Sequence, residues 1–463
     1  MSGRRHIRAA RWWRAVGMTA AVASVATVSS ACAALSDADL TLLPAAAGEA
    51  SRPHAAVAVV PAAPTPQASQ PTALRAAKAL VVGDDGREVR DHVWVLMRDG
   101  AFAGLLDAWQ AEPPAEYARV DLGDAWVMPG MVDLHSHVGG TFDINGPVYQ
   151  SNSELRVSPA VIPGNRSLRR GLASGVTTVL FIPGSATTVG GQGVLIKTGF
   201  ETYDRTLVRD PGSLKVAQAD NPKRWGYRMQ RSMLNWQVRD TMRRGVGYAK
   251  RWEAFERGEG PKPRIDLQFE IFRALRKDEA QISTHTQVAQ VVLASIQIMV
   301  VEHGLPMFID HGSFDAWRIA EVAEREGVPA ILGPRNFNSE VPGRGIDADG
   351  RIDGIAGRYQ EKGHSTIGFN TDAPVIPQEE LSLQAGMAVR FGFEDRNLNT
   401  VRGLTIVPAQ TVGLGGRLGS IHPGKDADLL VVDGHPADPR TTVRSVWLEG
   451  ELVYDAERDG RLW

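Results

Sequence analysis

The chain has 463 residues, of which 43% are hydrophobic and 22% charged, so it has a globular composition and is too long for one ordinary domain. Its formal net charge of −2 gives no reason to expect a nucleic acid as a partner. Cys32 is the only cysteine, which excludes an intramolecular disulfide and argues against a cysteine-based zinc site or a thiol nucleophile. A metal ion would therefore have to be held by His, Asp, Glu or a modified Lys.

The first 34 residues have the pattern of an export signal. Five arginines lie between positions 4 and 14, and small and apolar residues follow up to position 34. Ala31-Cys32-Ala33 resembles a cleavage site, and Cys32 is also a candidate for lipidation. An uncleaved anchor is disfavoured because the stretch is short and rich in Ser and Thr. We expect residues 1–34 to be a signal peptide and the protein to be exported, either periplasmic or lipid-anchored through Cys32 at the bacterial cell envelope.

Residues 35–72 are rich in Ala and Pro and predict a linker, because they offer too little large apolar surface to fold. Short strands begin at residue 73, and Arg98-Asp99-Gly100 between two apolar runs indicates a β-hairpin. Similar strands return near the C-terminus, at 426–432 and 443–454. We expect residues 73–128 and 403–463 to form one small β-sandwich domain from both ends of the chain.

Between these flanks, apolar runs alternate with stretches of helical periodicity. Helical spacing fits 225–257, 288–303 and 317–326. The strand-like runs are eight in number, which is the count of a (β/α)8 barrel. They lie at 127–137, 175–182, 193–197, 213–217, 280–285, 306–311, 328–333 and 364–372. We predict an α/β fold in which residues 129–402 form a TIM-type barrel.

Potential metal ligands lie at the ends of these strands. His135 and His137 are one residue apart and would share a face of the first strand, although two such histidines could equally be bonded to backbone or water. Enzymes with this barrel keep their chemistry at the C-terminal ends of the strands. Later strands end in further candidate ligands, namely Lys215, His285, His311 and Asp372. Together these residues predict a metal site.

Two stretches resemble the signature motifs of the amidohydrolase superfamily, and in particular its imidazolonepropionase-like branch. Residues 127–137 (VMPGMVDLHSH) resemble the first-strand motif, and residues 419–429 (GSIHPGKDADL) are similar to the return into the β domain. The resemblance covers about residues 73–455. It implies a barrel with a composite β domain and one or two divalent ions, zinc first, with manganese or iron as options.

The resemblance also implies which residues bind each ion. His135 and His137 would bind the buried ion together with Asp372, whereas His285 and His311 would bind the second ion. A carbamylated Lys215 would bridge the two ions, because a carbamate supplies two oxygens where an ammonium would repel a cation.

The implied mechanism is hydrolysis by a metal-bound hydroxide. The hydroxide would attack the carbonyl group of the substrate, which a metal and His311 would polarise. Asp372 would take the hydroxide proton and deliver it to the leaving nitrogen. The branch often reads Gly-Glu-Asn-Pro where this chain has Ala219-Asp220-Asn221-Pro222. We therefore keep open Lys197 as an alternative bridge and a site with a single metal.

We predict an enzyme that hydrolyses carbon–nitrogen bonds other than peptide bonds in a cyclic or linear small-molecule amide. Arg228, Arg335 and Asn336 are candidates for substrate binding, and we expect a homo-oligomer. An Xaa-Pro-type dipeptidase is the nearest enzymatic alternative. A catalytically lapsed barrel that acts as an exported binding protein is a non-enzymatic alternative, although the complete set of ligands argues against it.

Overall fold

The computed structural model describes residues 70–83, 88–218, 221–224, 229–334, 336–339 and 352–462. The predicted signal peptide, Cys32 and nearly all of the predicted linker lie outside the described residues, as do Arg228 and Arg335. Within the described part of the chain, no helix combines the length and the apolar character needed to cross a membrane.

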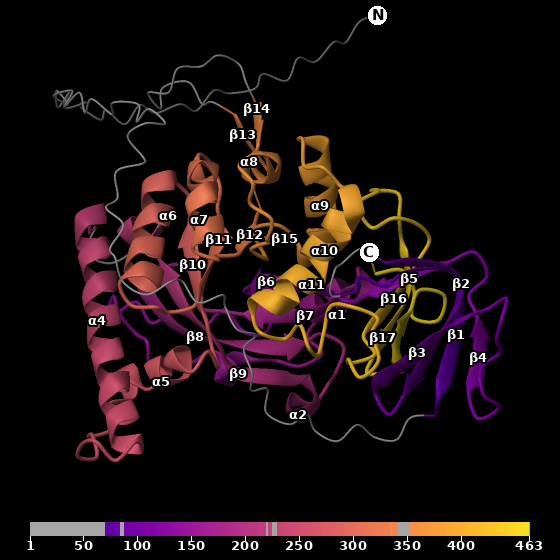
Figure 1. The fold of residues 1–463 in the computed structure, drawn as a ribbon, viewed down its shortest axis with the longest axis horizontal. Helices are drawn as coiled ribbons and strands as arrows, with labels where there is room; N and C mark the ends of the chain where they lie inside the picture. The colour runs from indigo at the N-terminus through magenta and orange to yellow at the C-terminus, as the bar shows by residue number, and fades with distance from the viewer. Residues whose placement is uncertain are drawn as a thin grey trace, which may run out of the picture. The chain divides into compact units, whose positions relative to one another are not determined.

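Eight strands form a nearly closed barrel in the middle of the chain (Figure 1). The two edge strands meet where Ser136 bridges to Ala373, and the backbone N–H of His137 donates to the carbonyl of Ala373 at 2.8 Å. The fold class predicted from the sequence is confirmed. The strands follow one another around the barrel as β6 (Met131–Ser136), β7 (Val176–Phe181), β8 (Val189–Lys197), β9 (Leu207–Ala217), β10 (Ile282–Thr286), β11 (Met307–His311), β12 (Ala330–Leu332) and β15 (Ile367–Phe369).

One strand, β8, has the opposite direction to both of its neighbours. It pairs antiparallel with β7 and with β9, whereas the other neighbouring strands of the barrel pair in parallel. Residues 182–188 connect β7 to β8 directly, with no helix between them. As a result, the C-terminal end of β8 lies at the opposite end of the barrel from the C-terminal ends of the other strands.

The three predicted helical regions contain α4 (Arg231–Glu256), α6 (Ala289–Ile296) and α7 (Ala320–Arg325). A π-helical segment, Gln297–Val301, prolongs α6. The other helices are α1 (Arg166–Ala173), α2 (Tyr203–Thr206), α3 (Asn221–Arg224), α5 (Ile271–Arg276), α8 (Ile355–Glu361), α9 (Leu381–Arg390), α10 (Asn399–Leu404) and α11 (Ile406–Thr411). Local sequence explains the start of α1, because the Asn165 side chain caps it by accepting from the N–H groups of Ser167 and Leu168.

The two ends of the chain form one further sheet, shown in indigo and yellow in Figure 1. The strand β5 joins the halves, because it pairs in parallel with β1 and antiparallel with β16. Side chains such as Leu74, Val95, Val127 and Leu429 pack in one buried apolar cluster on this sheet. Its strands are β1 (Thr72–Leu80), β2 (Val89–Arg98), β3 (Ala101–Asp107), β4 (Ala118–Asp121), β5 (Trp126–Pro129), β16 (Leu429–Val432), β17 (Val443–Leu448) and β18 (Glu451–Asp455).

The composite sheet leads directly into the barrel, since β5 ends at Pro129 and β6 begins at Met131. Gly130 between them has no room for a side chain, because a Cβ atom there would lie 2.2 Å from Oγ1 of Thr177. A larger residue would force β6 and β7 apart. The motif that the sequence analysis started from therefore also fixes how the two parts of the fold connect.

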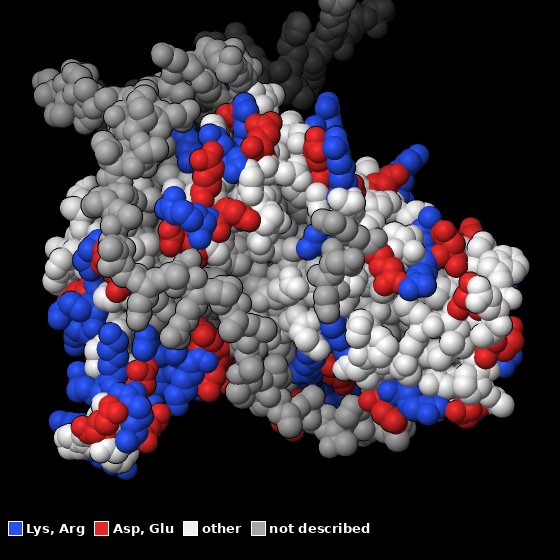
Figure 2. Space-filling model, in the orientation of Figure 1, with Lys and Arg blue, Asp and Glu red and all other residues white. Residues whose placement is uncertain are grey.

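The basic residues of α4 form pairs on its surface. Arg239 contacts Glu302 at 2.7 Å, and Arg243 contacts Asp240 at 2.6 Å. Figure 2 shows blue and red side chains mixed over the region of α4 and α5 at the lower left. These arginines form a solvated helix surface.

Candidate metal centre

The barrel brings six predicted residues to one end, from the C-terminal ends of five strands or from the loops that follow them. All of them are buried except Asp372, which is partly buried. Parallel strands present their C-terminal ends at one face, so residues far apart in the sequence meet there. The residues are His135 and His137 of β6, Lys215 of β9, His285 of β10, His311 of β11 and Asp372 after β15.

The first corner of the site contains His135, His137 and Asp372. The two Nε2 atoms lie 3.1 Å apart, and Oδ1 of Asp372 lies 3.1 Å from one and 3.3 Å from the other. His137 donates its Nδ1–H to the carbonyl of Ile182 at 2.9 Å, which leaves Nε2 free as a ligand atom. Three donor atoms therefore face one point.

The second corner contains His285 and His311. Nδ1 of His311 lies 2.8 Å from the carbonyl of Gly333, and its Nε2 atom lies 3.0 Å from Nδ1 of His285. The same Nε2 atom is 3.8 Å from Oδ2 of Asp372, so Asp372 faces both corners. His311 and Asp372 have positive φ angles of 76° and 50°. Such left-handed backbone is costly for residues with a side chain, and it is often found at functional sites.

Lys215 lies beneath both corners. Its side chain is fully buried, and Nζ is 3.4 Å from Nε2 of His135 and 3.4 Å from Oδ2 of Asp310. Burial lowers the pKa of Lys215 because it disfavours the ammonium more than nearby Asp310 and Asp372 stabilise it. Its position is compatible with the predicted bridging role.

The charges of the other groups suit metal binding. Burial lowers the pKa of His137 and His285, and burial together with His135 lowers the pKa of His311 to about 4. These rings are neutral at neutral pH, which is the form that binds metals. Burial would raise the pKa of Asp372, but His135 and His311 outweigh it and lower the pKa, so Asp372 is a carboxylate.

The donor set fits a divalent cation. His135, His137 and Asp372 each offer a ligand atom within 4.8 Å of one another, and so do His135, Asp310 and His311. Imidazole nitrogen and carboxylate oxygen are ligands for zinc, manganese and iron alike. Nε2 of His285 is buried without a hydrogen-bond partner. Burial would lower the pKa of His135, but Asp310 and Asp372 outweigh it and raise the pKa. The neutral rings of His137, His285 and His311 and the carboxylate of Asp372 are therefore available to hold one or two ions, and His135 joins them once it is deprotonated.

The site opens to solvent on the side of Asp372 and the loop between β7 and β8. Of the ligand candidates, the side chains of Asp372 and His137 remain 15% and 11% exposed, whereas that of His135 is fully buried. Ser185 of this loop is also partly exposed and lies 2.5 Å from Nδ1 of His285 through its Oγ atom.

The remaining predicted residues fall outside this cluster or outside the described residues. Lys197 is wrong as an alternative bridge, because the reversed β8 carries it to the other end of the barrel. Asn336 is half-buried, and its amide donates to Oε1 of Gln384 at 2.8 Å. The roles of Arg228, Arg335 and Asn336 in substrate binding stay predictions.

Sequence reasoning missed Asp310 and Ser185. Adjacent residues of a regular strand point to opposite faces, so Asp310 was not expected to share the site with His311. The positive φ of His311 ends this alternation and lets both side chains reach the cluster. An aspartate inside an otherwise apolar strand was the available signal for Asp310. No local signal marks Ser185, since its place depends on the reversed β8.

Comparisons with known proteins identify the class of hydrolases to which this barrel belongs. The profile of the Amidohydrolase family matches residues 364–454. The curated relative Amidohydrolase tasK from Hapsidospora irregularis is 24% identical over 382 residues, which is 74% of this chain but only 38% of tasK. The chain therefore spans well under half the length of this relative.

Solved structures agree over most of the chain. An amidohydrolase from Thermotoga maritima MSB8 is 28% identical, with a TM-score of 0.72, and the match covers 83% of this chain and 100% of that one. A prolidase complexed with N-methylphosphonate-L-proline is 17% identical with a TM-score of 0.52, covering 83% and 100%, and shows the shared fold alone. The chain belongs to the amidohydrolase superfamily. Its place in the imidazolonepropionase-like branch stays a prediction.

Proposed function

We propose that this protein is a metal-dependent hydrolase that cleaves a carbon–nitrogen bond, other than an ordinary peptide bond, in a cyclic or linear amide. One observation carries the proposal. Nε2 of His135, Nε2 of His137 and Oδ1 of Asp372 lie within 3.3 Å of one another at the open end of the barrel. Imidazole nitrogens and a carboxylate oxygen gathered in this way are the donor set of a metal-assisted hydrolase.

His135, His137 and Asp372 would hold one divalent ion, and His285 and His311 a second, with Lys215 between them as its carbamate. A bound ion would act as a Lewis acid toward the amide carbonyl and would lower the pKa of water. Lys215 fits this arrangement only without its positive charge, because Nζ is 3.4 Å from Nε2 of His135. The lowered pKa of Lys215 favours that uncharged form.

Asp372 is the group placed to move the proton. Its carboxylate faces both corners of the site and is the more exposed of the ligand candidates, so water and substrate reach it. It accepts a proton from the attacking water and returns it to the leaving nitrogen. His311 lies beside it at 3.8 Å, where its ring helps to orient the carbonyl group.

A panel of substrates on metal-loaded and metal-stripped protein tests this function. The panel contains cyclic amides, N-acyl amino acids and Xaa-Pro dipeptides, each assayed with zinc, manganese and iron. We expect turnover of an amide outside the dipeptide group, lost on chelation and restored by metal. Turnover of Xaa-Pro dipeptides alone would replace the proposal with a dipeptidase. Tight binding of a panel member without turnover, or no bound metal, would favour the lapsed barrel.

A further inference from the structure

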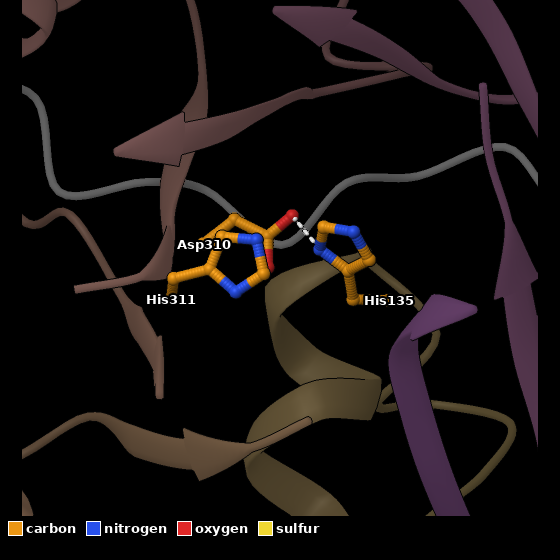
Figure 3. Close-up of side chains that lie close together, drawn as sticks. All are labelled: His135, Asp310 and His311. Carbon is orange, nitrogen blue, oxygen red and sulfur yellow. Dashed lines mark hydrogen bonds and ion pairs between the residues drawn. The ribbon is translucent and has the colours of Figure 1, made fainter. Parts of the chain in front are cut away.

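Asp310 lies beside Nδ1 of the His135 ring (Figure 3). His137 and Asp372 lie near the other ring nitrogen, Nε2. We propose that Asp310 is a positioning residue that fixes the ring of His135 and thereby sets the metal affinity of the centre, without being a ligand itself. This inference rests on the proposed function, because it concerns the same metal site.

The contact between Asp310 and His135 is short and fully buried. Nδ1 of His135 donates to Oδ2 of Asp310 at 2.6 Å, and both side chains are 0% exposed. A histidine that donates its Nδ1–H to a carboxylate keeps its lone pair on Nε2, and its ring orientation is fixed. That Nε2 atom is the one that lies 3.1 Å from Nε2 of His137 and 3.1 Å from Oδ1 of Asp372.

The two carboxylates thus lie on opposite sides of one imidazole and have different surroundings. Oδ1 of Asp310 accepts from Nδ2 of Asn370 at 3.3 Å, and Oδ2 is also 3.4 Å from Nζ of Lys215. Both oxygens of Asp310 therefore already have donors from the protein. The oxygens of Asp372 instead face the Nε2 atoms of the histidines, which is the geometry of a ligand.

Asp310 also connects three separate parts of the barrel. It lies on β11 and contacts His135 of β6, Lys215 of β9 and Asn370 just after β15. Asn370 is two residues from Asp372. Through its bond to Asn370, the Asp310 carboxylate therefore also holds the segment that carries the ligand candidate Asp372. A change at Asp310 should therefore weaken metal binding without removing any donor atom that touches the ion.

Zinc binding to Asp310→Asn and Asp310→Ala tests the inference. The asparagine keeps an acceptor for Nδ1–H but loses the charge, whereas the alanine loses the acceptor. Asp428→Asn is the matched control, because Asp428 is also a buried carboxylate but lies at the other end of the barrel, where it contacts Lys197 and accepts from the backbone N–H of Glu449. The dissociation constant comes from competition with a chromophoric chelator, stoichiometry from elemental analysis, and folding from circular dichroism.

We expect the dissociation constant for zinc to rise about 10-fold in Asp310→Asn and about 100-fold in Asp310→Ala. The stoichiometry at saturating zinc should equal that of the unmodified protein, and the dissociation constant of the Asp428→Asn control should stay within a few-fold of the unmodified value. The absorption spectrum of bound cobalt should change in Asp310→Asn, because the His135 ligand is less firmly held. If Asp310→Ala does not fold, Asp310→Asn alone decides.

Three results would overturn the inference. An unchanged zinc affinity in the folded Asp310 variants would show that the contact does not affect the site. The loss of one bound ion at saturating zinc would make Asp310 a ligand. An equal loss of affinity in the Asp428→Asn control would show that the effect is general damage to the barrel. If the unmodified protein binds no zinc, manganese or iron, the proposed function fails instead.

Discussion

Each end of the barrel buries a lysine, and the pKa values of the two lysines are shifted in opposite directions. Lys197 of β8 is 1% exposed and contacts Asp426 at 2.6 Å, Glu449 at 2.8 Å and Asp428 at 3.1 Å. Burial lowers its pKa, but these carboxylates outweigh burial and raise it. Lys215 of the neighbouring strand β9 has one carboxylate, Asp310, at 3.4 Å, and burial lowers its pKa.

The direction of one strand produces this difference. Because β8 runs antiparallel to β9, the C-terminal ends of the two strands lie at opposite ends of the barrel. Lys197 therefore meets acidic residues around the composite sheet, and its partners make it a structural tie between the two parts of the fold. Lys215 meets histidines and a single aspartate, an environment that leaves it available for chemistry.

Asp372→Asn tests the open end and should have the largest effect. The amide can neither accept the proton of water nor carry the negative charge, so we expect turnover to fall by about 10²- to 10⁴-fold. The unfolding transition should hardly move, because Asp372 lies at the rim of the site. Steady-state kinetics and thermal unfolding measure the two effects. Wild-type turnover in a metal-loaded variant would contradict the proposed mechanism.

Lys197→Met tests the end of the barrel opposite the metal centre, where Lys197 contacts three carboxylates. The change leaves three carboxylates in a buried space, where Arg417 still contacts Asp426 at 2.8 Å. We expect the free energy of unfolding to fall by about 3–5 kcal/mol. The zinc affinity of the folded fraction should not change. Denaturant unfolding measures the loss, and a variant as stable as the wild type would show that the ion cluster is dispensable.

The same variant should respond to pH with a defined sign. Burial, together with Asp426 and Glu449, raises the pKa of Asp428 from 3.8 to about 6, although Lys197 opposes the shift. A raised folded-state pKa contributes stability below the unfolded pKa, and this contribution is lost as pH rises through about 6. Without Lys197 the pKa rises further, so the deficit of Lys197→Met should be smaller at pH 5 than at pH 8. A deficit that grows toward pH 5 would contradict this account.

Lys215→Met should give the converse result at the open end. The substitution removes a buried lysine whose lowered pKa favours the uncharged form, and Asp310 keeps His135 and Asn370 as partners. We therefore expect the free energy of unfolding to change by less than about 2 kcal/mol. Metal content should fall to at most one ion per chain, because the bridging group is gone. Elemental analysis and denaturant unfolding of the same sample check both points. Full metal content would remove Lys215 from the centre.

Arg243→Ala should have the smallest effect and calibrates the others. Arg243 contacts Asp240 at 2.6 Å on the solvated surface of α4, and its side chain is 68% exposed. An exposed ion pair contributes little, so we expect a change of less than about 0.5 kcal/mol in the free energy of unfolding. Denaturant unfolding measures it in the same buffer as Lys197→Met. If Arg243→Ala lost as much free energy of unfolding as Lys197→Met, buried and exposed ion pairs would not differ in their contribution to stability.

The sequence predicted the barrel and most of the residues at its open end. Hydrophobic runs located the eight strands because a buried strand must be apolar along its length, and polar residues at strand ends stood out against them. His135, His137, His285, His311 and Asp372 could be named on that basis, together with Lys215. Short-range pattern also indicated the hairpin of β2 and β3 and the helix α4.

The tertiary structure alone decided which residues face each other. The alternation of side chains along a strand does not say in which direction the strand runs relative to the adjacent strands. The reversed direction of β8 could therefore not be recognised from residues 189–197. For this reason Lys197 was kept as an alternative bridge. For the same reason Asp310 and Ser185 went unnoticed. One reaches the site because the backbone of His311 is left-handed, and the other because a loop replaces a helix. The direction of a strand and the sign of the φ angle at its end are set by long-range packing, which no local window of sequence contains.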